Sequence, residues 1–411
     1  MNEARWVVFD AEGDDLKPSL FYCLSYETWN GEKGTLTDYG DIRKFFLEFD
    51  VYVGHNIALW DLLELERVVG ISIPDRFVDT RCLAWYLDPS RKKNGLEAYG
   101  EHYGVPKLAI RDWKNGSLDE YIARCERDVQ INVILWNDQL SFLNELYGQD
   151  VWPILRYLES KMRQVELQHK SRWKLDVELC KSNLRELQEE RQPRYDELQR
   201  VLPEVPVTKT FTQPKVLYRK DGELTVAGAR WKDTLEQNGY RLGDLESLDV
   251  VVDYEQGNPN SYDQLKSWLF SLGWKPREYK STVNAKGETK EVPQINLPPQ
   301  KGGGLCPSIL ELAEEEPAID SLANWGVIKH RISILEGFLR DVSDDGYLTA
   351  SINGLTNTFR FKHSILVNLP KVESRYGKYI RPCLIAPDDS HELLGSDMSG
   401  LEDKIKQHFI Y

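Results

Sequence analysis

The sequence has no apolar run of about 18 residues or more, the length that a helix needs to cross a membrane. Its six cysteines include no CxxC pair, which argues against a zinc site or a disulfide framework. Residues 1–5 have no signal-peptide pattern and lead directly into a strand-like run. These absences predict a cytoplasmic protein that has reduced thiols and no membrane partner.

Positive charge is also scarce. The 411 residues include 52 Lys and Arg against 66 Asp and Glu, and most of the net charge of −14 falls in residues 1–150. Nucleic-acid-binding proteins are more often basic, so this balance counts mildly against DNA as a substrate. An acidic site that binds divalent metal ions would weaken that objection.

The chain is long enough for two or three domains with substantial cores. Residues 1–150 alternate strand-like and helical patterns, which predicts an α/β domain. The strand-like runs are 6–10, 20–26 and 51–54, and the helical runs are 41–48, 58–69, 80–87 and 120–146. Beyond them, the pattern predicts helix at 151–200 and 318–340, irregular structure at 201–310, and short strands from 346 to the apolar run Leu393–Asp397.

Two carboxylates close the first predicted strand. Asp10 and Glu12 follow the apolar run 6–9, and side chains two residues apart on a strand point to the same face. A D-x-E pattern alone is weak evidence, because most such strand ends are not catalytic. Asp61 and Asp128 each lie beside a helical pattern and could join them. Four converging carboxylates would hold two Mg²⁺ or Mn²⁺ ions, which prefer oxygen ligands and promote phosphodiester cleavage.

A polar pair, His55 and Asn56, precedes Trp60 and Asp61. This spacing suits the start of a helix, where Asn56 can act as the cap. Core packing is the commoner role for an aromatic residue such as Trp60, although its ring could also stack on a frayed base. The segment is therefore more specific than the D-x-E pattern.

The order and spacing of these acids resemble the 3′–5′ exonuclease domains of the DnaQ-like, RNase H-type superfamily, especially those of bacteriophage DNA polymerases. The resemblance implies two Mg²⁺ (or Mn²⁺) ions per site and DNA with single-stranded 3′ ends as substrate. It also implies that His55 and Asn56 position the strand. The metal ligands carried over are Asp10, Glu12, Asp61 and Asp128.

One position departs from this superfamily. The family has Tyr four residues before the last Asp, or His five residues before it, to orient the attacking water. Here the fourth residue before Asp128 is Arg124. Tyr121 lies one turn earlier on nearly the same helical face and is the candidate substitute.

The second informative segment is 393–402, an apolar run followed by D-x-S-G-L-E. Alone, it indicates an ordinary strand, turn and helix, with Asp397 or Ser399 as the cap. It also resembles motif A of family A (DNA polymerase I-like) polymerases, especially phage ones. That resemblance implies that Asp397 is a catalytic metal ligand and that Glu402 shapes the sugar side of the nucleotide site.

Other segments resemble the DNA contacts of the same family, in the same order. Asn258, Ser261 and Gln264 match a thumb motif at a helix start, whose amides and hydroxyl can grip phosphate without reading bases. Basic positions follow in the returning thumb helix and before the palm strand. The further implied primer–template contacts are Lys329, Arg331, Arg360, His363 and Arg381.

Together these resemblances imply three regions. Residues 1–150 would be an RNase H-like exonuclease domain, 151–340 a helical polymerase thumb, and 341–411 an incomplete α+β palm that ends just after motif A. Family A polymerases continue with fingers and a second palm acid, and one carboxylate cannot organise a two-metal polymerase site. We therefore expect a second polypeptide that carries the fingers and the rest of the palm, as in a split replicative polymerase; a piece of a longer protein is the other explanation.

Three functions remain open at this stage. The first is proofreading by the exonuclease–thumb subunit of a split family A polymerase, with DNA synthesis only in the complete complex. The second is a stand-alone 3′–5′ exonuclease. The third is a non-catalytic DNA-clamping or assembly module, which Arg124 would favour. The D-x-S-G-L-E segment favours the first function over the second.

Overall fold

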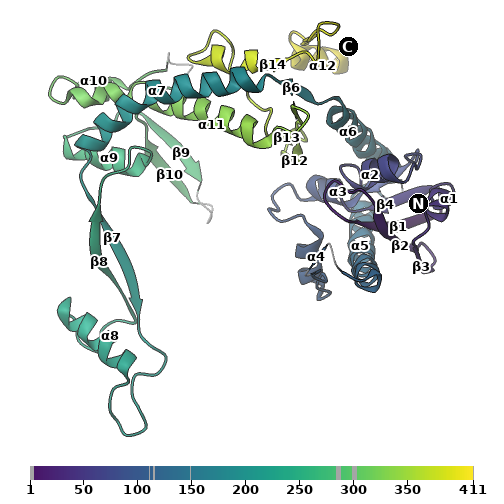
Figure 1. Cartoon of the computed structure of the whole chain (residues 1–411), viewed down its shortest axis with the longest axis horizontal. Coiled ribbons are helices and arrows are strands. Elements are labelled where there is room, and N and C mark those ends of the chain that lie inside the picture. The colour runs from purple at the N-terminus through teal and green to yellow at the C-terminus, as the bar shows by residue number, and fades with distance from the viewer. Residues whose placement is uncertain are drawn as a thin grey trace. The chain divides into compact units, whose positions relative to one another are not determined.

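The computed structural model describes residues 4–110, 112–113, 116–148, 150–283, 288–298 and 303–410. The chain forms two compact units. The first comprises Met1–Cys180, Gly337–Lys371 and Arg381–Tyr411, and the second comprises Lys181–Glu336 and Val372–Ile380. Figure 1 labels helices and strands of both units where there is room. None of the described helices is long and apolar enough to cross a membrane.

The first unit is built on a mixed five-stranded sheet with the order β3-β2-β1-β4-β5. Its strands are β1 (Trp6–Gly13), β2 (Phe21–Thr28), β3 (Lys33–Leu36), β4 (Val51–Gly54) and β5 (Phe77–Asp79). The central strand β1 pairs antiparallel with β2 and parallel with β4. The three strands predicted at 6–10, 20–26 and 51–54 are therefore confirmed.

Six helices complete the first part of this unit. They are α1 (Tyr39–Phe45), α2 (Asp61–Val68), α3 (Thr80–Leu87), α4 (Leu96–Tyr103), α5 (Leu118–Tyr147) and α6 (Trp152–Ser171). The helix predicted at 120–146 is confirmed as α5, which begins with a capping box between Ser117 and Glu120. Its inner face packs against β1 and β2, so α5 carries polar side chains to the edge of the central strand.

Aromatic packing fixes the position of β1. Phe9 is fully buried and meets the rings of Phe46, Phe45 and Tyr52 edge-on, at centroid distances of 5.3, 6.2 and 6.4 Å. Edge-to-face pairs of this kind add about 0.5–1.5 kcal/mol beyond area burial. The Tyr52 hydroxyl also donates to the Phe45 carbonyl oxygen at 2.7 Å. The backbone that presents the neighbouring residue, Asp10, is thus rigidly held.

The C-terminal part of the first unit adds small sheets. The strand β6 (Trp173–Leu175) lies between β11 (Tyr347–Leu348) and β14 (Leu384–Ile385), and β12 (Ile352–Leu355) pairs with β13 (Phe361–His363). Ile352 and Leu355 of β12 join the main hydrophobic core of the unit. The 3-10 turn η4 (Arg381–Cys383) precedes β14, and the helix α12 (Leu401–Ile410) lies at the end of the described chain.

The apolar strand expected at Leu393–Asp397 is wrong. Residues 391–398 have no regular secondary structure, although the expected helix does follow as α12. A strand requires a hydrogen-bonded neighbour, and none of the described strands pairs with this segment. Leu394 is accordingly 96% exposed.

The second unit is mainly helical, with two ribbons. It contains most of α7 (Val177–Val201), followed by β7 (Val205–Thr212), α8 (Val226–Gln237), β8 (Ser247–Glu255), α9 (Tyr262–Ser271), β9 (Tyr279–Val283), β10 (Thr289–Pro293), α10 (Pro307–Leu310), η2 (Pro317–Leu322), most of α11 (Trp325–Asp341) and η3 (Gly377–Tyr379). The prediction of irregular structure at 201–310 is wrong, because β7 and β8 form an antiparallel ribbon, with α8 at its far end in Figure 1. Both strands are largely exposed, but apolar residues do recur at alternate positions of β7 (Val205, Val207 and Phe211), a strand signal that the prediction missed. The helical segment predicted at 151–200 is two helices, α6 and α7, separated by β6.

Candidate active site

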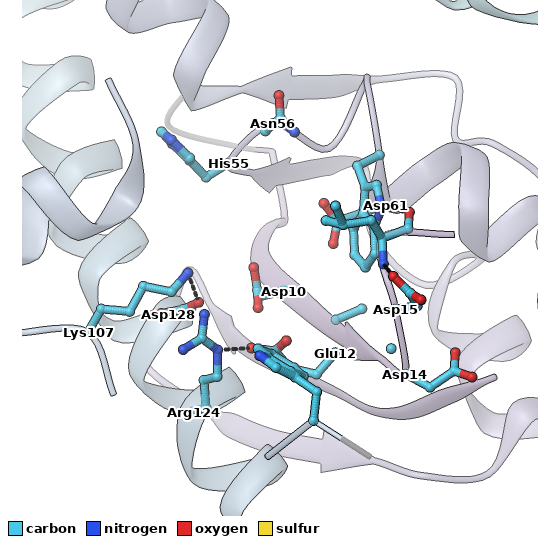
Figure 2. Close-up of a pocket in the computed structure, with 15 residues that line it drawn as sticks. Asp10, Glu12, Asp14, Asp15, His55, Asn56, Asp61, Lys107, Arg124 and Asp128 are labelled. Atoms are coloured by element: carbon cyan, nitrogen blue, oxygen red, sulfur yellow. Dashed lines mark hydrogen bonds and ion pairs between the residues drawn. The ribbon is translucent and has the colours of Figure 1, made fainter. Parts of the chain in front are cut away.

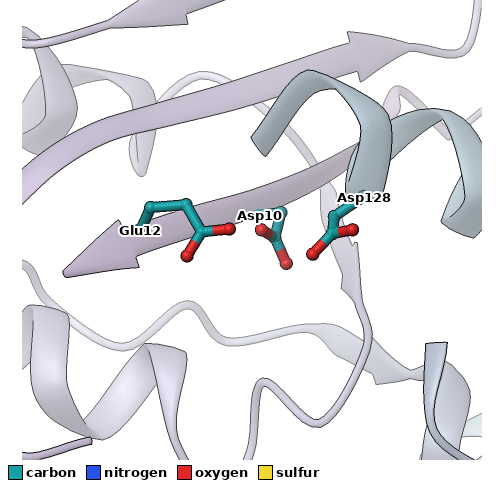
Figure 3. A group of neighbouring side chains, drawn as sticks. All are labelled: Asp10, Glu12 and Asp128. Carbon is teal, nitrogen blue, oxygen red and sulfur yellow. The ribbon is translucent and has the colours of Figure 1, made fainter. Parts of the chain in front are cut away.

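A pocket of about 530 Å³ opens at the end of the central strand β1 (Figure 2). Asp10 and Glu12 point into it from β1, Asp61 from the start of α2, and Asp128 from α5. One oxygen each from Asp10, Glu12 and Asp128 lies within 4.8 Å of the others (Figure 3). The structure thus brings the four predicted ligands to one pocket, in which Asp61 lies outside this group of three.

Local structure explains this convergence. Asp10 and Glu12 share one face of β1 because side chains alternate along a strand. Asp61 is the first residue of α2, where the partial positive charge of the helix N-terminus favours a carboxylate. Asp128 lies on the buried face of α5, which packs against β1. Three elements that are distant in sequence therefore deliver oxygen atoms from four residues to one pocket.

Burial and mutual repulsion raise the pKa values of these acids. Burial raises the pKa of Asp61 to about 8 and that of Glu12 to about 7. The pKa of Asp10 lies well above its usual range, first because of burial and then because Asp128, Asp61 and Glu12 repel its charge. Burial also raises the pKa of Asp128. Clustered acids of this kind are typical of functional sites, and a bound cation would favour their ionised forms.

Two oxygen atoms in the pocket are evidence on whether a metal ion would fit there. Asp61 Oδ1 and Asp128 Oδ1 are buried and have no hydrogen-bond partner within the part of the chain that the structure describes. Buried polar atoms usually have a partner, so these two oxygens are free to act as ligands. The donor set consists of carboxylate oxygens alone, which matches Mg²⁺ or Mn²⁺. The residues present fit such an ion.

Two cations also reach these carboxylates, and the sequence did not reveal their role. Arg124 Nε donates to Glu12 Oε1 at 2.8 Å, and Lys107 Nζ lies 2.5 Å from Asp128 Oδ2 (Figure 2). A signal for Arg124 exists, because it lies one turn before Asp128 on the same helical face. Lys107 lies between α4 and α5, where no periodicity indicates its direction.

The predicted strand-positioning pair, His55 and Asn56, lines the same pocket. The Nε2 atom of His55 donates to the Asn94 carbonyl oxygen and its Nδ1 faces Thr80 Oγ1, both at 2.9 Å. Burial lowers the pKa of His55 to about 3, so the ring is neutral. The capping role expected for Asn56 is wrong, because the cap position of α2 is Trp60. Asn56 instead has a positive φ of 69° and accepts a hydrogen bond from Arg81.

Tyr121 does not line the pocket. Its hydroxyl donates to the Trp113 carbonyl oxygen at 2.8 Å, and its ring stacks on Tyr22 at a centroid distance of 3.9 Å. Tyr121 and Asp128 share a helical face but are seven residues apart, which is about 10 Å along α5. The structure therefore gives Tyr121 a packing role and does not bring its hydroxyl to the carboxylates.

The mouth of the pocket includes residues that the sequence did not single out. Trp113 and the acidic pair Asp14 and Asp15 line it together with Leu16. Trp60 lies there as well, and its Nε1 donates to the Leu16 carbonyl oxygen at 2.7 Å. Leu16 itself is 84% exposed. Two indole rings and an exposed aliphatic side chain thus line the same pocket as the four carboxylates.

The candidates near the C-terminus are spread over the surface of the first unit. Asp397 is exposed in the segment without regular structure. Glu402 forms an exposed ion pair with Arg360 at 3.1 Å, so these two candidates lie together. Arg381 donates to the carbonyl oxygens of Pro370 and Leu369, and it shares a second pocket of about 600 Å³ with His363.

The thumb candidates gather at the start of α9 in the second unit. Ser261 caps this helix, because its Oγ accepts from the backbone N–H of Gln264 at 3.3 Å. The side-chain Oε1 of Gln264 accepts from the backbone N–H of Asn258 at 2.6 Å. Lys329 donates to the Asn260 carbonyl oxygen at 3.1 Å. Arg331 contacts its neighbour His330 instead.

Comparisons with known proteins point in one direction. No protein-family model matches the sequence. Over 109 residues the chain is 32% identical to the DNA-directed DNA polymerase of Escherichia phage Phieco32, a match that covers 26% of this chain and 18% of that protein.

The solved structures that resemble this chain include the POL domain of Pol1 from M. smegmatis in complex with a DNA primer-template and dNTP. The TM-score is 0.53 at 13% identity, over 93% of this chain and 55% of that one. The family B DNA polymerase of Pyrobaculum calidifontis has a TM-score of 0.31 at 19% identity, over 38% of this chain and 27% of that one. This chain therefore spans less than two thirds of each of these proteins. Its mixed α/β fold resembles that of the Pol1 POL domain. Over 109 residues its sequence resembles a phage DNA-directed DNA polymerase.

Proposed function

We propose that this chain belongs to a bacteriophage-type family A replicative DNA polymerase and that its β1 pocket is a 3′–5′ exonuclease site for proofreading. One observation carries the proposal: Asp10, Glu12, Asp61 and Asp128 direct their carboxylates into a single pocket, and two of their oxygens have no partner among the described residues. Structural ion pairs would have satisfied those oxygens. An acidic pocket with two unpartnered oxygen atoms instead suits a nuclease that works with divalent ions.

In this proposal the four carboxylates hold two Mg²⁺ or Mn²⁺ ions. Asp10 lies between Glu12 and Asp128 (Figure 3) and would contribute its carboxylate to the ligand set. When bound, the ions would supply Lewis acidity that activates water and offsets charge on the departing 3′ oxygen. The protein contributes the rigid β1 backbone, which keeps the ligands preorganised.

The pocket mouth supports a frayed DNA 3′ end as the substrate. Trp60 and Trp113 offer flat rings for base stacking, which tolerates any sequence and contributes about 1–3 kcal/mol per base. His55 is neutral and holds the Asn94 carbonyl group, so in this proposal it shapes the wall along which the strand lies. No base-reading contact is required, since proofreading must accept every sequence.

The rest of the chain fits a polymerase thumb and part of a palm. We assign residues 1–150 to the exonuclease domain, 151–340 to the thumb and 341–411 to a partial palm with Asp397 as a polymerase metal ligand. The exposed apolar side chains of Leu393 and Leu394, shortly before Asp397, support a surface that a partner covers. A second polypeptide with the fingers and the remaining palm would cover this segment and complete the synthetic site.

A digestion assay tests the exonuclease proposal. The full chain is incubated with Mg²⁺ and a 5′-labelled single strand, and the product lengths are followed. The double variant Asp10→Ala with Glu12→Ala should abolish stepwise shortening from the 3′ end while leaving the circular dichroism spectrum unchanged. A matched control, Glu32→Ala with Glu48→Ala, removes two exposed charges from the same unit and should digest normally. Full digestion by the first variant would refute the site.

A second assay addresses synthesis. Primer extension should appear only when extract from the natural source supplies the complementing chain. Asp397→Ala should then stop extension and leave digestion unchanged. Extension by this variant in the complemented reaction would remove Asp397 from the polymerase site.

One observation favours a second candidate function, a non-catalytic DNA clamp. Glu12 is already paired with Arg124, which occupies the sequence position of the usual water-orienting Tyr. If the wild-type chain binds single-stranded DNA but never shortens it with Mg²⁺ or Mn²⁺, the clamp replaces the exonuclease as the better account.

A further inference from the structure

Arg124 and Lys107 are held in very different ways. Arg124 is fixed by three contacts: it donates to Glu12 and to the Leu108 carbonyl oxygen, and its guanidinium lies 5.0 Å from the Trp113 ring centroid. Lys107 has one polar partner among the described residues, the Asp128 carboxylate. Its side chain is also 25% exposed, against 15% for that of Arg124. Arg124 is therefore a fixed counter-charge, whereas Lys107 can leave.

Arg124 and Lys107 pair with only two of the four carboxylates in the pocket. Glu12 and Asp128 each have a positively charged partner, while Asp10 and Asp61 have no ion pair among the described residues. A first divalent ion is attracted most strongly to the Asp10 and Asp61 side. A second ion near Glu12 and Asp128 would meet the Lys107 ammonium, which lies 2.5 Å from an Asp128 oxygen. Like charges at such short range repel strongly where water is largely excluded.

We propose that Lys107 is a built-in competitor of the second metal ion, and that it must swing away from Asp128 before that ion can bind. The inference rests on the proposed two-ion nuclease site. A lysine suits this role, because its ammonium is a point charge on a flexible four-carbon stem. Asp128 Oδ1, which has no described partner, stays available to the first ion while Oδ2 is occupied by Lys107.

The consequence is a site with two different metal affinities. One ion binds tightly, and the other binds weakly because it must break the Lys107–Asp128 contact. The ammonium also keeps the Asp128 carboxylate in place in the metal-free protein. Removing this ammonium should strengthen the weaker affinity and leave the stronger one nearly unchanged.

Mn²⁺ binding to the full chain, followed by electron paramagnetic resonance of the free ion, tests the inference without any activity readout. Lys107→Gln should tighten the weaker site by about tenfold or more, the effect of losing one charge-assisted contact to a ligand. Lys107→Met is a second variant with the same expected result, for use if the Lys107→Gln protein does not fold. The control Lys92→Gln makes the same charge change at an exposed position outside the pocket and should leave both affinities unchanged.

The outcomes separate the inference from the proposed function. Two unequal Mn²⁺ sites in the wild type, of which Lys107→Gln tightens the weaker, support the inference. Two sites that keep their affinities in Lys107→Gln and Lys107→Met would overturn it and leave the nuclease proposal standing. If Asp10→Ala with Glu12→Ala binds Mn²⁺ as the wild type does, both are wrong.

Discussion

Replacing Asp61 by asparagine should stabilise the metal-free protein while removing a metal ligand. Asp61 is 4% exposed, and one of its oxygens has no partner among the described residues. Burial, reinforced by Glu12 and Asp79, raises its pKa from 3.8 to about 8. At neutral pH the folded protein therefore holds this acid mainly protonated, whereas the unfolded chain ionises it. An uncharged amide of the same shape has no such penalty.

The size of this stability gain follows from the pKa shift of Asp61. One pKa unit corresponds to about 1.36 kcal/mol, so a group held protonated at pH 7 that ionises near 3.8 when unfolded loses at most about 4 kcal/mol. The four acids interact and share this cost, so we expect Asp61→Asn to gain about 2 kcal/mol. For a unit of this size, that gain raises the melting temperature by roughly 5 °C.

Thermal unfolding followed by circular dichroism, in EDTA and then in Mg²⁺, is the assay. In EDTA, Asp61→Asn should melt above the wild type. In Mg²⁺ the wild type should gain stability, because an ion that binds only the folded state stabilises it, and the variant should gain much less. A variant that melts below the wild type in EDTA would refute the reasoning, since the buried charge would then be satisfied by the protein itself.

Two further predictions concern stability. First, the pKa values of Glu12 and Asp61 are raised in the folded state, to about 7 and about 8. The stability that these acids contribute is therefore present below their unfolded pKa values of 4.5 and 3.8, and it is lost as the pH rises through about 7 and 8. Melting temperatures measured in EDTA over this pH range check the prediction, and a flat profile would contradict it. Asp79 accepts hydrogen bonds from four backbone amides, at 2.9–3.2 Å, so Asp79→Ala should cost about 3 kcal/mol or more in urea unfolding; a loss below about 1 kcal/mol would contradict it.

The residues that the sequence could place share a simple periodicity. Asp10 and Glu12 follow an apolar strand, where a two-residue spacing fixes the face, and Asp128 lies in a long amphipathic helix. Their order along the chain then predicted one site. Tyr121 illustrates the limit of this reasoning, because a shared helical face does not bring together side chains two turns apart.

What the sequence could not reveal depends on distant partners. The pairing of Arg124 with Glu12 joins residues 112 positions apart, and Lys107 lies in a connection without periodicity. The expected strand at Leu393–Asp397 had the right composition but has no described neighbour to pair with. Composition sets the tendency of a segment, whereas pairing decides its structure.

The most direct measurement of the central claim is a crystal structure of the full chain soaked in Mn²⁺, with anomalous scattering recorded. We expect anomalous peaks inside the β1 pocket, with carboxylate oxygens of Asp10 and Asp61 among the ligands and Glu12 or Asp128 completing the set. An empty pocket, at a Mn²⁺ concentration that supports digestion by the same protein, would contradict the account and place the nuclease centre elsewhere.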